Sequence, residues 1–308
     1  MNFEHIPVLR DECIAALNID PAGTYADLTV GGAGHALKIA ERLKTGRLFC
    51  FDKDADAVAA ATERLKACGN VTVIQSDFVD MKARLAEYGV TEINGALMDI
   101  GVSSHQLDTP SRGFSYNSDA PLDMRMSGEG IGAREIINTY SAEELAKIFR
   151  EYGEEAFAWQ IAKNIVRARE EAPIETTLEL AEIIARSVPA KARRNKNPAK
   201  RVFQAVRIAV NDELGRLSTG IDEAAGLLAP KGRLAIITFH SLEARTVRQK
   251  FGSLTSGCTC PPDFPVCVCG KTPLFRYVTK KPIEPSAEEI ESNRRSKSAK
   301  LFALEKID

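Results

Sequence analysis

The feature that most constrains the fold is a glycine-rich turn near the N-terminus. Tyr25-Ala-Asp-Leu-Thr-Val-Gly-Gly-Ala-Gly-His35 predicts a short buried strand, a turn and the start of a helix. A second apolar run, Arg47-Leu-Phe-Cys-Phe-Asp52, ends in an acid. This is the layout of a nucleotide-binding βαβ unit, in which the glycines let the backbone approach a ligand and the acid accepts the ribose hydroxyls.

The turn departs from the Gly-x-Gly-x-x-Gly pattern of dinucleotide-binding proteins. It reads Asp27-x-Thr29-x-Gly31-Gly32-x-Gly34, with an acid two residues before the threonine. That variant fits a ligand carrying a cation and an amino acid better than one carrying a pyrophosphate, so S-adenosylmethionine is the candidate. The alternative is a tight strand–helix turn that binds no ligand.

Apolar runs and helical stretches alternate over the first hundred residues. The pattern favours a parallel sheet covered by helices on both faces, an α/β class with a doubly wound domain. The expected strands are 24–29, 47–52, 71–75 and 95–100, and the expected helices are 35–44, 54–67 and 80–88.

A helical segment interrupts this alternation. Residues 106–132 are rich in Gly, Ser, Asp and Pro and predict a long loop, which in a compact protein is usually functional. The α/β pattern resumes with a helix end and turn at 227–233 and a strand at 234–240. We therefore expect an α/β domain formed by 1–108 and 216–308, with a cysteine-containing C-terminal extension, and an inserted all-helical domain at 109–215. The helices expected in this part are 141–171, opened by a capping box at Ser141–Glu144, then 177–187 and 199–227.

The bulk composition excludes some classes of function. The net charge is −1, so any binding of nucleic acid has to come from local patches. No apolar run approaches the ~20 residues of a membrane span, and the N-terminus lacks the pattern of a secretion signal. The scattered cysteines fit a reducing compartment, which predicts a cytoplasmic protein.

Asp99 is the leading candidate for a catalytic residue. It ends an expected central strand in Ala96-Leu-Met-Asp-Ile-Gly-Val-Ser-Ser-His-Gln-Leu107, and open α/β sheets bind their ligands at that edge. Gln106 follows close behind. The alternative for Asp99 is a strand-end acid that caps a turn. Ser76-Asp77-Phe78 follows the third strand, where the acid suits an exocyclic amine and the ring a flat base, although a turn with a core Phe explains it equally well.

Two further clusters stand out. The run from 191 to 201 carries six basic residues in eleven and no acid, which suits phosphate contacts or, equally, a solvated face. Its members are Lys191, Arg193, Arg194, Lys196, Lys200 and Arg201. A second basic cluster, 294–300, lies near the C-terminus. Two C-x-C pairs, Cys258/Cys260 and Cys267/Cys269, can place four thiolates around one zinc ion, but reduced, unliganded thiols are the alternative.

Together these motifs resemble one family, the RsmH (MraW) methyltransferases. The likeness runs from about His5 to the C-terminus and includes long, specific strings. They are His5-Ile-Pro-Val-Leu, Asp27-x-Thr-x-Gly-Gly-Ala-Gly-His35, Asp99-Ile-Gly-Val-Ser-Ser-His-Gln-Leu-Asp108, Arg112-Gly-Phe-Ser-Tyr116, Pro121-Leu-Asp-Met-Arg-Met126, Phe203-Gln-Ala-Val-Arg-Ile208-x-Val-Asn211 and Phe239-His-Ser-Leu-Glu243.

The resemblance implies a class I, Rossmann-like methyltransferase fold with an inserted helical domain for RNA recognition. It implies S-adenosylmethionine as methyl donor and N4 of a cytidine in the decoding centre (P site) of 16S ribosomal RNA as target, within the assembled 30S subunit. Carried onto matching positions, it implies that Ala33, Gly34 and His35 contact the donor at the turn, Asp52 at the ribose, Phe78 near the adenine, and Asp99 and Gln106 near the methionine and methyl end.

In one respect the chain departs from other amino-methyltransferases. They carry an acid, Asn or Ser followed by Pro-Pro and an aromatic residue at this strand end, whereas this chain reads Asp99-Ile-Gly-Val. Two other functions stay open from the residues alone. One is a methyltransferase acting on DNA or a small amine, and the other is a non-catalytic assembly factor that uses the donor as a structural ligand.

Overall fold

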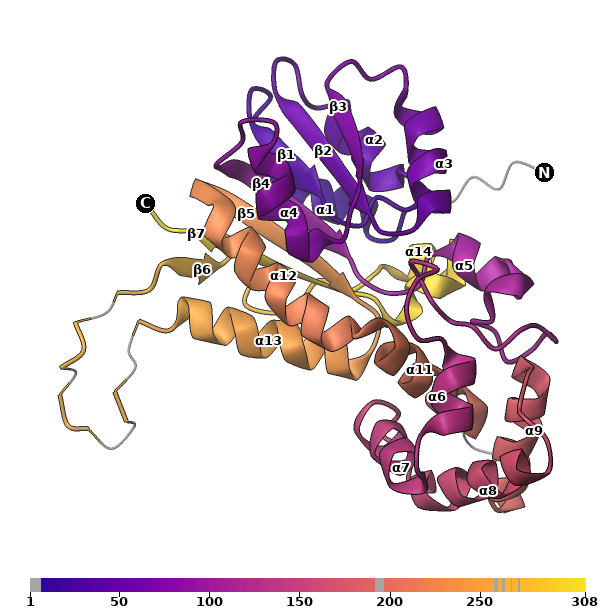
Figure 1. Cartoon of the computed structure of the whole chain (residues 1–308). Helices are drawn as coiled ribbons and strands as arrows, with labels where there is room; N and C mark the ends of the chain where they lie inside the picture. The colour runs from indigo at the N-terminus through magenta and orange to yellow at the C-terminus, as the bar shows by residue number, and fades with distance from the viewer. Residues whose placement is uncertain (1–6, 192–196, 258–259, 262–263, 267, 271) are drawn as a thin grey trace. The chain divides into compact units, whose positions relative to one another are not determined.

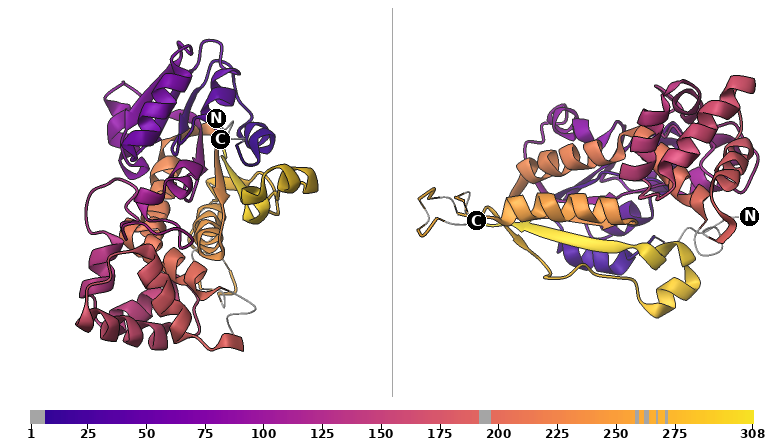
Figure 2. Two further views of the ribbon diagram at one scale, coloured as in Figure 1. Left: turned by 90° about the vertical axis from the view of Figure 1, so that its right-hand side faces the viewer. Right: turned by 90° about the horizontal axis from the view of Figure 1, so that it is seen from below.

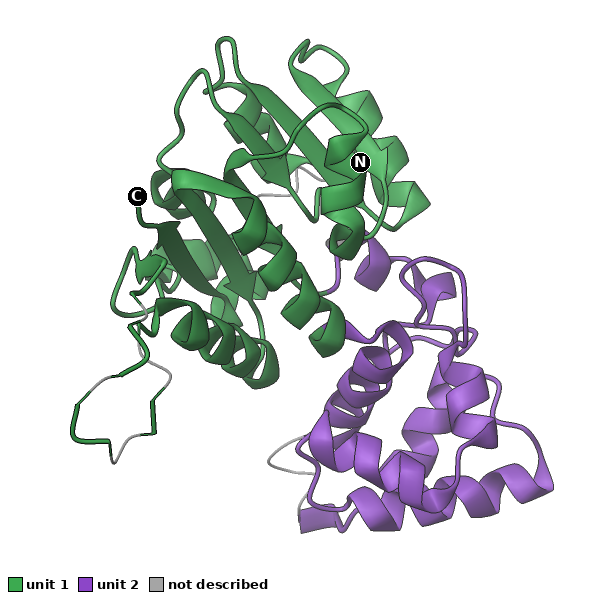
Figure 3. Ribbon diagram, turned by 60° about the vertical axis from the view of Figure 1, so that its left-hand side comes forward, with its two compact units in different colours: residues 1–101, 214–308 green, residues 102–213 purple. Residues whose placement is uncertain are grey.

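The structure is a computed structural model that describes residues 7–191, 197–257, 260–261, 264–266, 268–270 and 272–308 (Figure 1). The chain divides into two compact units (Figure 3). Unit 1 comprises residues 1–101 and 214–308, and unit 2 comprises residues 102–213. The sequence predicts 109–215 for the helical part, whereas unit 2 begins at Val102 and ends at Glu213.

Unit 1 is built on a seven-stranded sheet with the strand order β3-β2-β1-β4-β5-β7-β6. Strands β1 to β5 pair in parallel, and β7 runs antiparallel between β5 and β6. The expected α/β fold with a doubly wound sheet is therefore confirmed. The strands are β1 (Thr24–Asp27), β2 (Arg47–Asp52), β3 (Val71–Gln75), β4 (Ile93–Asp99), β5 (Leu228–Thr238), β6 (Phe275–Tyr277) and β7 (Lys300–Lys306).

Helices cover both faces of this sheet (Figure 2). Side chains of α4, α12 and α13 pack with Met98 on one face, while side chains of α1, α2 and α3 pack with Leu97 on the other. Burial on two faces explains why these strands read as continuous apolar runs. The helices of unit 1 are α1 (Arg10–Leu17), α2 (Gly34–Ala40), α3 (Ala55–Leu65), α4 (Met81–Ala86), α12 (Glu213–Leu227, in unit 1 from Leu214 on), α13 (Ser241–Thr255) and α14 (Ala287–Ser292), with 3₁₀ turns η1 (Phe78–Asp80) and η3 (Arg294–Ser298).

The regular elements in the described part of unit 2 are helical, apart from a single bridge between Pro121 and Thr176. Residues 113–132 contain no helix, so the irregular stretch is shorter than the loop predicted for 106–132. Its own core is formed by apolar side chains of α6 to α11, among them Phe149, Ile161 and Phe203. Its elements are α5 (Ser104–Asp108), the 3₁₀ turn η2 (Pro110–Arg112), α6 (Ala133–Thr139), α7 (Ala142–Glu151), α8 (Ala158–Glu171), α9 (Thr177–Ser187) and α11 (Pro198–Asn211). None of the described helices in either unit has the length and apolarity that a membrane crossing requires.

The single helix predicted for 141–171 is wrong, because two helices, α7 and α8, occupy this range. The break follows Gly153, where a Cβ would lie 2.7 Å from the Phe149 carbonyl oxygen and 2.8 Å from that of Arg201. Glu154 then adopts a left-handed conformation with φ 48°. The predicted capping box at Ser141 is confirmed, since its Oγ accepts from the Glu144 N–H and the Glu144 carboxylate accepts from the Ser141 N–H.

The helix predicted for 199–227 is also divided, into α11 and α12. Asp212 between them has φ 47°, which ends the helical path. The break is fixed by Asn211, whose side chain accepts from the Met126 N–H at 2.8 Å and donates to the Met124 carbonyl at 2.8 Å. The helical spacing of apolar residues continues across this break, because contacts with distant residues leave no mark on it. The sequence pattern therefore predicts one helix where there are two.

The helix end predicted at the start of 227–233 is confirmed, since α12 ends at Leu227, but the turn predicted after it is instead the irregular start of β5. Leu228 already pairs with Ile93, and the regular register resumes where Arg233 pairs with Gly95. Lys231 takes up the extra length with φ 63°. The strand therefore begins at Leu228, earlier than the expected residue 234.

Candidate functional site

Three acids end three neighbouring strands of unit 1. Asp27 is the last residue of β1, Asp52 of β2 and Asp99 of β4, and β1 pairs with both of the other strands. Because the carboxyl ends of parallel strands meet at the same edge of a sheet, the three carboxyl groups share the edge where open α/β folds bind ligands.

The glycine turn joins β1 to α2 beside these acids. Gly31 has φ 46° and Ala33, which precedes α2, has φ 59°. A left-handed conformation at alanine is strained, and such strain persists only where the surroundings hold it. At Gly34 a side chain would collide with the ring of Pro7. The turn is thus a rigid backbone segment with a defined path.

Asp52 binds the backbone of the glycine turn, and its carboxylate can still accept further hydrogen bonds. Its Oδ2 accepts from the Gly31 N–H at 3.0 Å and its Oδ1 accepts from the Asp54 N–H at 3.0 Å. Burial raises the pKa of this carboxyl, while the two backbone hydrogen bonds oppose the rise. Each carboxylate oxygen has a second lone pair, so the group can also accept from a ligand's hydroxyls.

Asp99 is held by its backbone while one of its carboxyl oxygens is left without a partner. The Asp99 N–H donates to Thr29 Oγ1 at 2.6 Å. A quarter of the side-chain surface is exposed, but Oδ1 is buried and no described residue donates a hydrogen bond to it. A buried acceptor without a donor is costly and rare, so it points to a ligand group.

The acids raise one another's pKa values at this edge. Burial first, and then the negative charges of Asp27 and Glu243, raises the pKa of Asp99 to about 8. Burial and the neighbouring Asp52 raise the pKa of Asp27 to about 7, although hydrogen bonds from the backbone of Thr29 and Ala36 oppose the rise. Perturbed carboxyl groups clustered at a ligand-binding edge are typical of functional sites.

His35 lies behind the turn with its ring buried. Its Nε2 is 2.9 Å from the Val8 carbonyl, which can only accept, so Nε2 carries a proton. Its Nδ1 is 3.7 Å from Asp99 Oδ2, beyond hydrogen-bond distance. The ring therefore ties the segment before α1 to the glycine turn and places an imidazole beside Asp99.

The Asp77–Phe78 pair is already engaged within unit 1. Asp77 Oδ1 accepts from the Val79 N–H at 3.1 Å, and Oδ2 pairs with Arg216 at 2.7 Å. The half-buried Phe78 ring packs on α12, where a Cβ on Gly220 would be 2.5 Å from it. Both local contacts are structural, and the role of Phe78 near an adenine stays a prediction.

Sequence reasoning missed three residues that shape the edge. Thr29 binds the Asp99 backbone, and Asp27 is the buried acid beside it. Both belong to the quoted Asp27-x-Thr29 spacing, which was the available signal. Glu243 is fully buried and accepts from the Phe239 N–H at 2.7 Å and the His240 N–H at 3.1 Å, at the end of β5. Its signal was the His-x-x-Glu pattern of a helix start.

The remaining predicted residues belong to unit 2 or to the C-terminal region. Gln106 is buried and forms a capping box with Ser103 at the start of α5, so its carbonyl oxygen is engaged. Lys191 and Lys200 are exposed, whereas Arg201 donates to the Glu154 carbonyl at 3.3 Å and lies 3.7 Å from the Glu155 carboxylate. Arg193, Arg194 and Lys196 lie outside the described residues.

The cysteine cluster is only partly described. Cys260 and Cys269 are half-buried, and Cys260 Sγ accepts from the Val268 N–H at 3.4 Å. Cys258 and Cys267 lie outside the described residues, so the zinc interpretation stays a prediction.

Comparison with known proteins gives a consistent answer over the whole chain. The sequence model of the MraW methylase family matches residues 2–307. The curated protein named Ribosomal RNA small subunit methyltransferase H from Lachnospira eligens is 53% identical, over 100% of this chain and 99% of that protein. Proteins of the same name from Clostridium botulinum (strain Loch Maree / Type A3) and Symbiobacterium thermophilum are each 52% identical, over 100% of this chain and 100% and 98% of those proteins.

The resemblance that the sequence motifs indicate is therefore confirmed over the full length, and the α/β sheet with a separate helical unit is the fold that it implies. The chain belongs to the MraW methylase family.

Proposed function

We propose that this protein is an S-adenosylmethionine-dependent methyltransferase that methylates N4 of a cytidine in the decoding centre of 16S ribosomal RNA, within the small ribosomal subunit. The observation that carries the proposal is the buried, unpartnered Oδ1 of Asp99 beside the glycine turn. The names of the full-length relatives support small-subunit ribosomal RNA as the substrate.

The edge of the sheet fits the donor. At Gly32 a Cβ would meet no described atom within 4 Å, so the turn leaves space beside the backbone. Asp52 can accept from ribose hydroxyls while it holds Gly31, and the buried acids suit a cationic ligand. We assign donor contacts to Ala33, Gly34, His35, Asp52, Phe78, Asp99 and Gln106, with the His35 contribution coming from its backbone because its ring is bound to Val8.

Bound S-adenosylmethionine supplies an electrophilic methyl group on a sulfonium. The cytosine amine is a weak nucleophile, because its lone pair is delocalised into the ring. The protein therefore has to hold N4 in line with the methyl group, and positioning of this kind supplies a large part of a rate enhancement. Asp99 accepts a hydrogen bond from the amine, which localises the lone pair and stabilises the positive charge that develops on nitrogen.

The protonation state of Asp99 follows from its surroundings. A carboxyl group with a pKa of about 8 is mostly neutral at neutral pH in the free protein. A cationic donor next to it favours the carboxylate, because an opposite charge lowers the pKa of an acid. Binding of the donor thus prepares the acceptor that the amine needs, and the Thr29 hydroxyl keeps the Asp99 backbone in place.

We assign RNA recognition to unit 2, with contacts to phosphates from the basic run. Lys191 and Lys200 are exposed and available for such contacts, and Arg201 is partly engaged by Glu154 and Glu155. The target cytidine has to leave its stack to reach the sheet edge, which fits the preference of proteins for unpaired, splayed bases in RNA. A cytoplasmic location follows from a ribosomal substrate.

The proposal is tested by incubating the purified protein with labelled S-adenosylmethionine and three acceptors, followed by nucleoside analysis. The acceptors are unmodified small subunits, naked small-subunit RNA and duplex DNA. We expect N4-methylated cytidine with the subunits alone. Label in the DNA would show that the substrate is DNA and not RNA. No label in any acceptor, with intact binding of the donor, would favour an assembly factor.

A further inference from the structure

Unit 2 exposes a tryptophan that its core does not require. Trp159 is the chain's one tryptophan, and 45% of its surface is exposed in the first turn of α8. The core side of α8 is made by Ala158, Ile161, Ala162 and Ile165. Tryptophan is highly buried on average, so a ring that is nearly half exposed on a helix makes this surface a candidate for binding.

Two cations share the helix face of Trp159. Lys163 and Arg167 follow it at intervals of four residues, a spacing that places side chains along one side of a helix. Both are exposed, and no ion pair with another described residue forms at either. We call Trp159, Lys163 and Arg167 the α8 face. The acids of α8, Glu170 and Glu171, lie beyond it at the C-terminal end.

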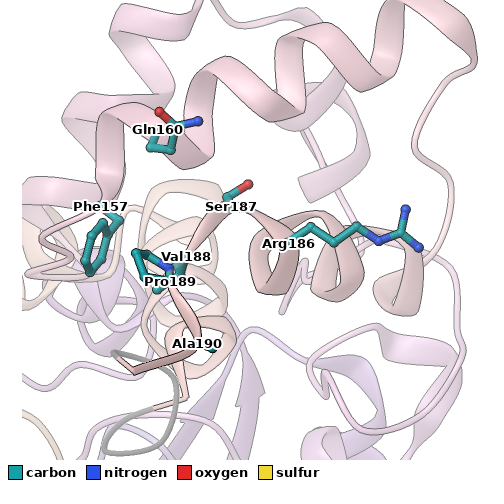
Figure 4. A pocket seen from close by; sticks show the side chains of 7 residues that line it. All are labelled: Phe157, Gln160, Arg186, Ser187, Val188, Pro189 and Ala190. Carbon is teal, nitrogen blue, oxygen red and sulfur yellow. The ribbon is translucent and has the colours of Figure 1, made fainter.

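An open pocket of about 600 Å³ lies at the N-terminal end of the same helix. Figure 4 shows the Phe157 ring next to Val188 and Pro189, with the Arg186 guanidinium directed away from them. Gln160, one residue after Trp159, also lines the pocket, and its amide donates to Asn164 at 3.3 Å. The last lining residue, Ala190, is followed by the exposed Lys191.

We propose that the α8 face and the Phe157 pocket bind a single-stranded segment of the RNA substrate. One base stacks on Trp159, a neighbouring base enters the pocket beside Phe157 and Gln160, and the phosphates meet Lys163, Arg167 and Lys191. Aromatic platforms interleaved with cations are how proteins hold single strands without reading their sequence. The inference rests on the proposed function, because it takes RNA as the substrate.

The charge on the α8 face favours RNA over a protein partner. A protein interface centred on a tryptophan is expected to surround it with apolar side chains and few charges. Here the next residues on the face are unpaired cations, whose desolvation by a neutral partner would be costly. A polyanion with planar bases can stack on the Trp159 ring and place its phosphates beside Lys163 and Arg167.

The single tryptophan makes the test direct. Tryptophan fluorescence is followed while wild-type protein is titrated with a mixed-sequence single-stranded RNA and with the same sequence as a duplex. A base stacked on Trp159 is expected to quench the emission with the single strand, and to a much smaller degree with the duplex. The readout does not require methyl transfer, so it separates this inference from failure of the proposed reaction.

Variants then localise the site by anisotropy of the labelled single strand. Trp159→Ala is expected to weaken binding about tenfold, the scale of one lost stack, while Trp159→Phe keeps most of the affinity. Lys163→Gln with Arg167→Gln is expected to lower the salt dependence by the equivalent of two phosphate contacts. Leu178→Ala, which trims another exposed apolar side chain of unit 2, is the matched control and is expected to bind like wild type.

Unchanged fluorescence at saturating RNA, or equal affinity of Trp159→Ala and wild type, would overturn the inference. So would a fluorescence change that depends on protein concentration without RNA, accompanied by a concentration-dependent gain in mass in light scattering that Trp159→Ala lacks, since the face would then join two copies of the chain.

Discussion

The carboxyl edge of the sheet and the α8 face treat charge in opposite ways. At the edge, Asp27 is buried and Asp99 is half-buried with a buried Oδ1, their pKa values are raised, and each is held by a hydrogen bond with Thr29. On the α8 face, Lys163 and Arg167 are exposed and have no described ion-pair partner. The first arrangement suits a ligand that is held in one orientation, while the second suits a polyanion whose position is not prescribed.

Under the proposed assignments, this difference separates the residues that carry out the chemistry from those that recognise the RNA. Transfer of a methyl group depends on placing atoms, so its residues are held by hydrogen bonds that were formed during folding. Recognition of RNA depends on many weak, solvated contacts to phosphates, so its residues stay free until the partner arrives. Substitutions at the edge should therefore change turnover, and substitutions in unit 2 should change RNA affinity.

The largest effect is expected at Asp99. Asp99→Ala removes the proposed acceptor for the cytosine amine, and loss of one such electrostatic contact costs about 10²–10³ in turnover. RNA affinity should stay near the wild-type value. Single-turnover methylation and filter binding measure the two quantities.

The control for this substitution is Glu92→Gln, which removes an exposed acid just before β4, at the opposite end of the strand. We expect wild-type turnover. If Asp99→Ala methylates as fast as this control, Asp99 is not the acceptor.

A smaller effect is expected at Thr29. Thr29→Val keeps the shape but removes the acceptor of the Asp99 N–H, and an unsatisfied buried donor costs about 1–3 kcal/mol. Urea unfolding should show this loss of stability, and turnover should fall about tenfold because Asp99 moves. Thr29→Ser keeps the hydroxyl and should restore both quantities; equal behaviour of the two variants would show that the hydroxyl does not position Asp99.

The pH dependence tests the protonation of the edge. The acceptor must be ionised. The value of kcat/KM for the methyl donor should therefore rise with pH toward about 8, the pKa of Asp99 in the protein without donor. The folded state binds more protons than the unfolded chain between 3.8 and about 8, so the free energy of unfolding should fall as pH rises through that range. Asp99→Asn should remove the Asp99 part of the stability slope and leave the part due to Asp27. A flat profile in wild type would contradict the assignment.

The smallest effect separates two neighbouring cations of unit 2. Lys200→Gln should weaken RNA binding a few-fold and lower the salt slope by about one phosphate contact, with stability unchanged. Arg201→Gln should also lower stability, because Arg201 contacts the Glu154 carbonyl and the buried Glu155. Salt titrations with thermal melts distinguish them, and equal melts would show that the Glu155 contact contributes nothing measurable.

Much of the fold could be predicted from local patterns. The apolar runs ending at Asp52 and Asp99 became strands β2 and β4, because burial on both faces leaves a strong signal in the sequence. The helix breaks at Glu154 and Asp212 could not be predicted, since they depend on contacts with residues far along the chain, such as Arg201 and Met126. The spacing of apolar residues along a helix does not indicate such long-range contacts.

The candidate site divides in the same way. Asp52 and Asp99 were predicted because strand ends are readable from a sequence. Thr29 and Glu243 were missed as site residues, because their importance comes from which backbone N–H groups they receive in the folded chain. The exposure of Trp159 could likewise not be predicted from the sequence, because this residue keeps the helical spacing that is typical of core residues.

The division of labour between the two units is tested most directly by a crossed binding measurement. Donor and RNA affinities are determined by calorimetry and anisotropy for Asp52→Asn and for Lys191→Gln with Lys200→Gln. We predict that Asp52→Asn weakens donor binding by about 2 kcal/mol and leaves RNA binding unchanged, whereas the double lysine variant does the reverse. Loss of both affinities in either variant would contradict the separation of chemistry from recognition.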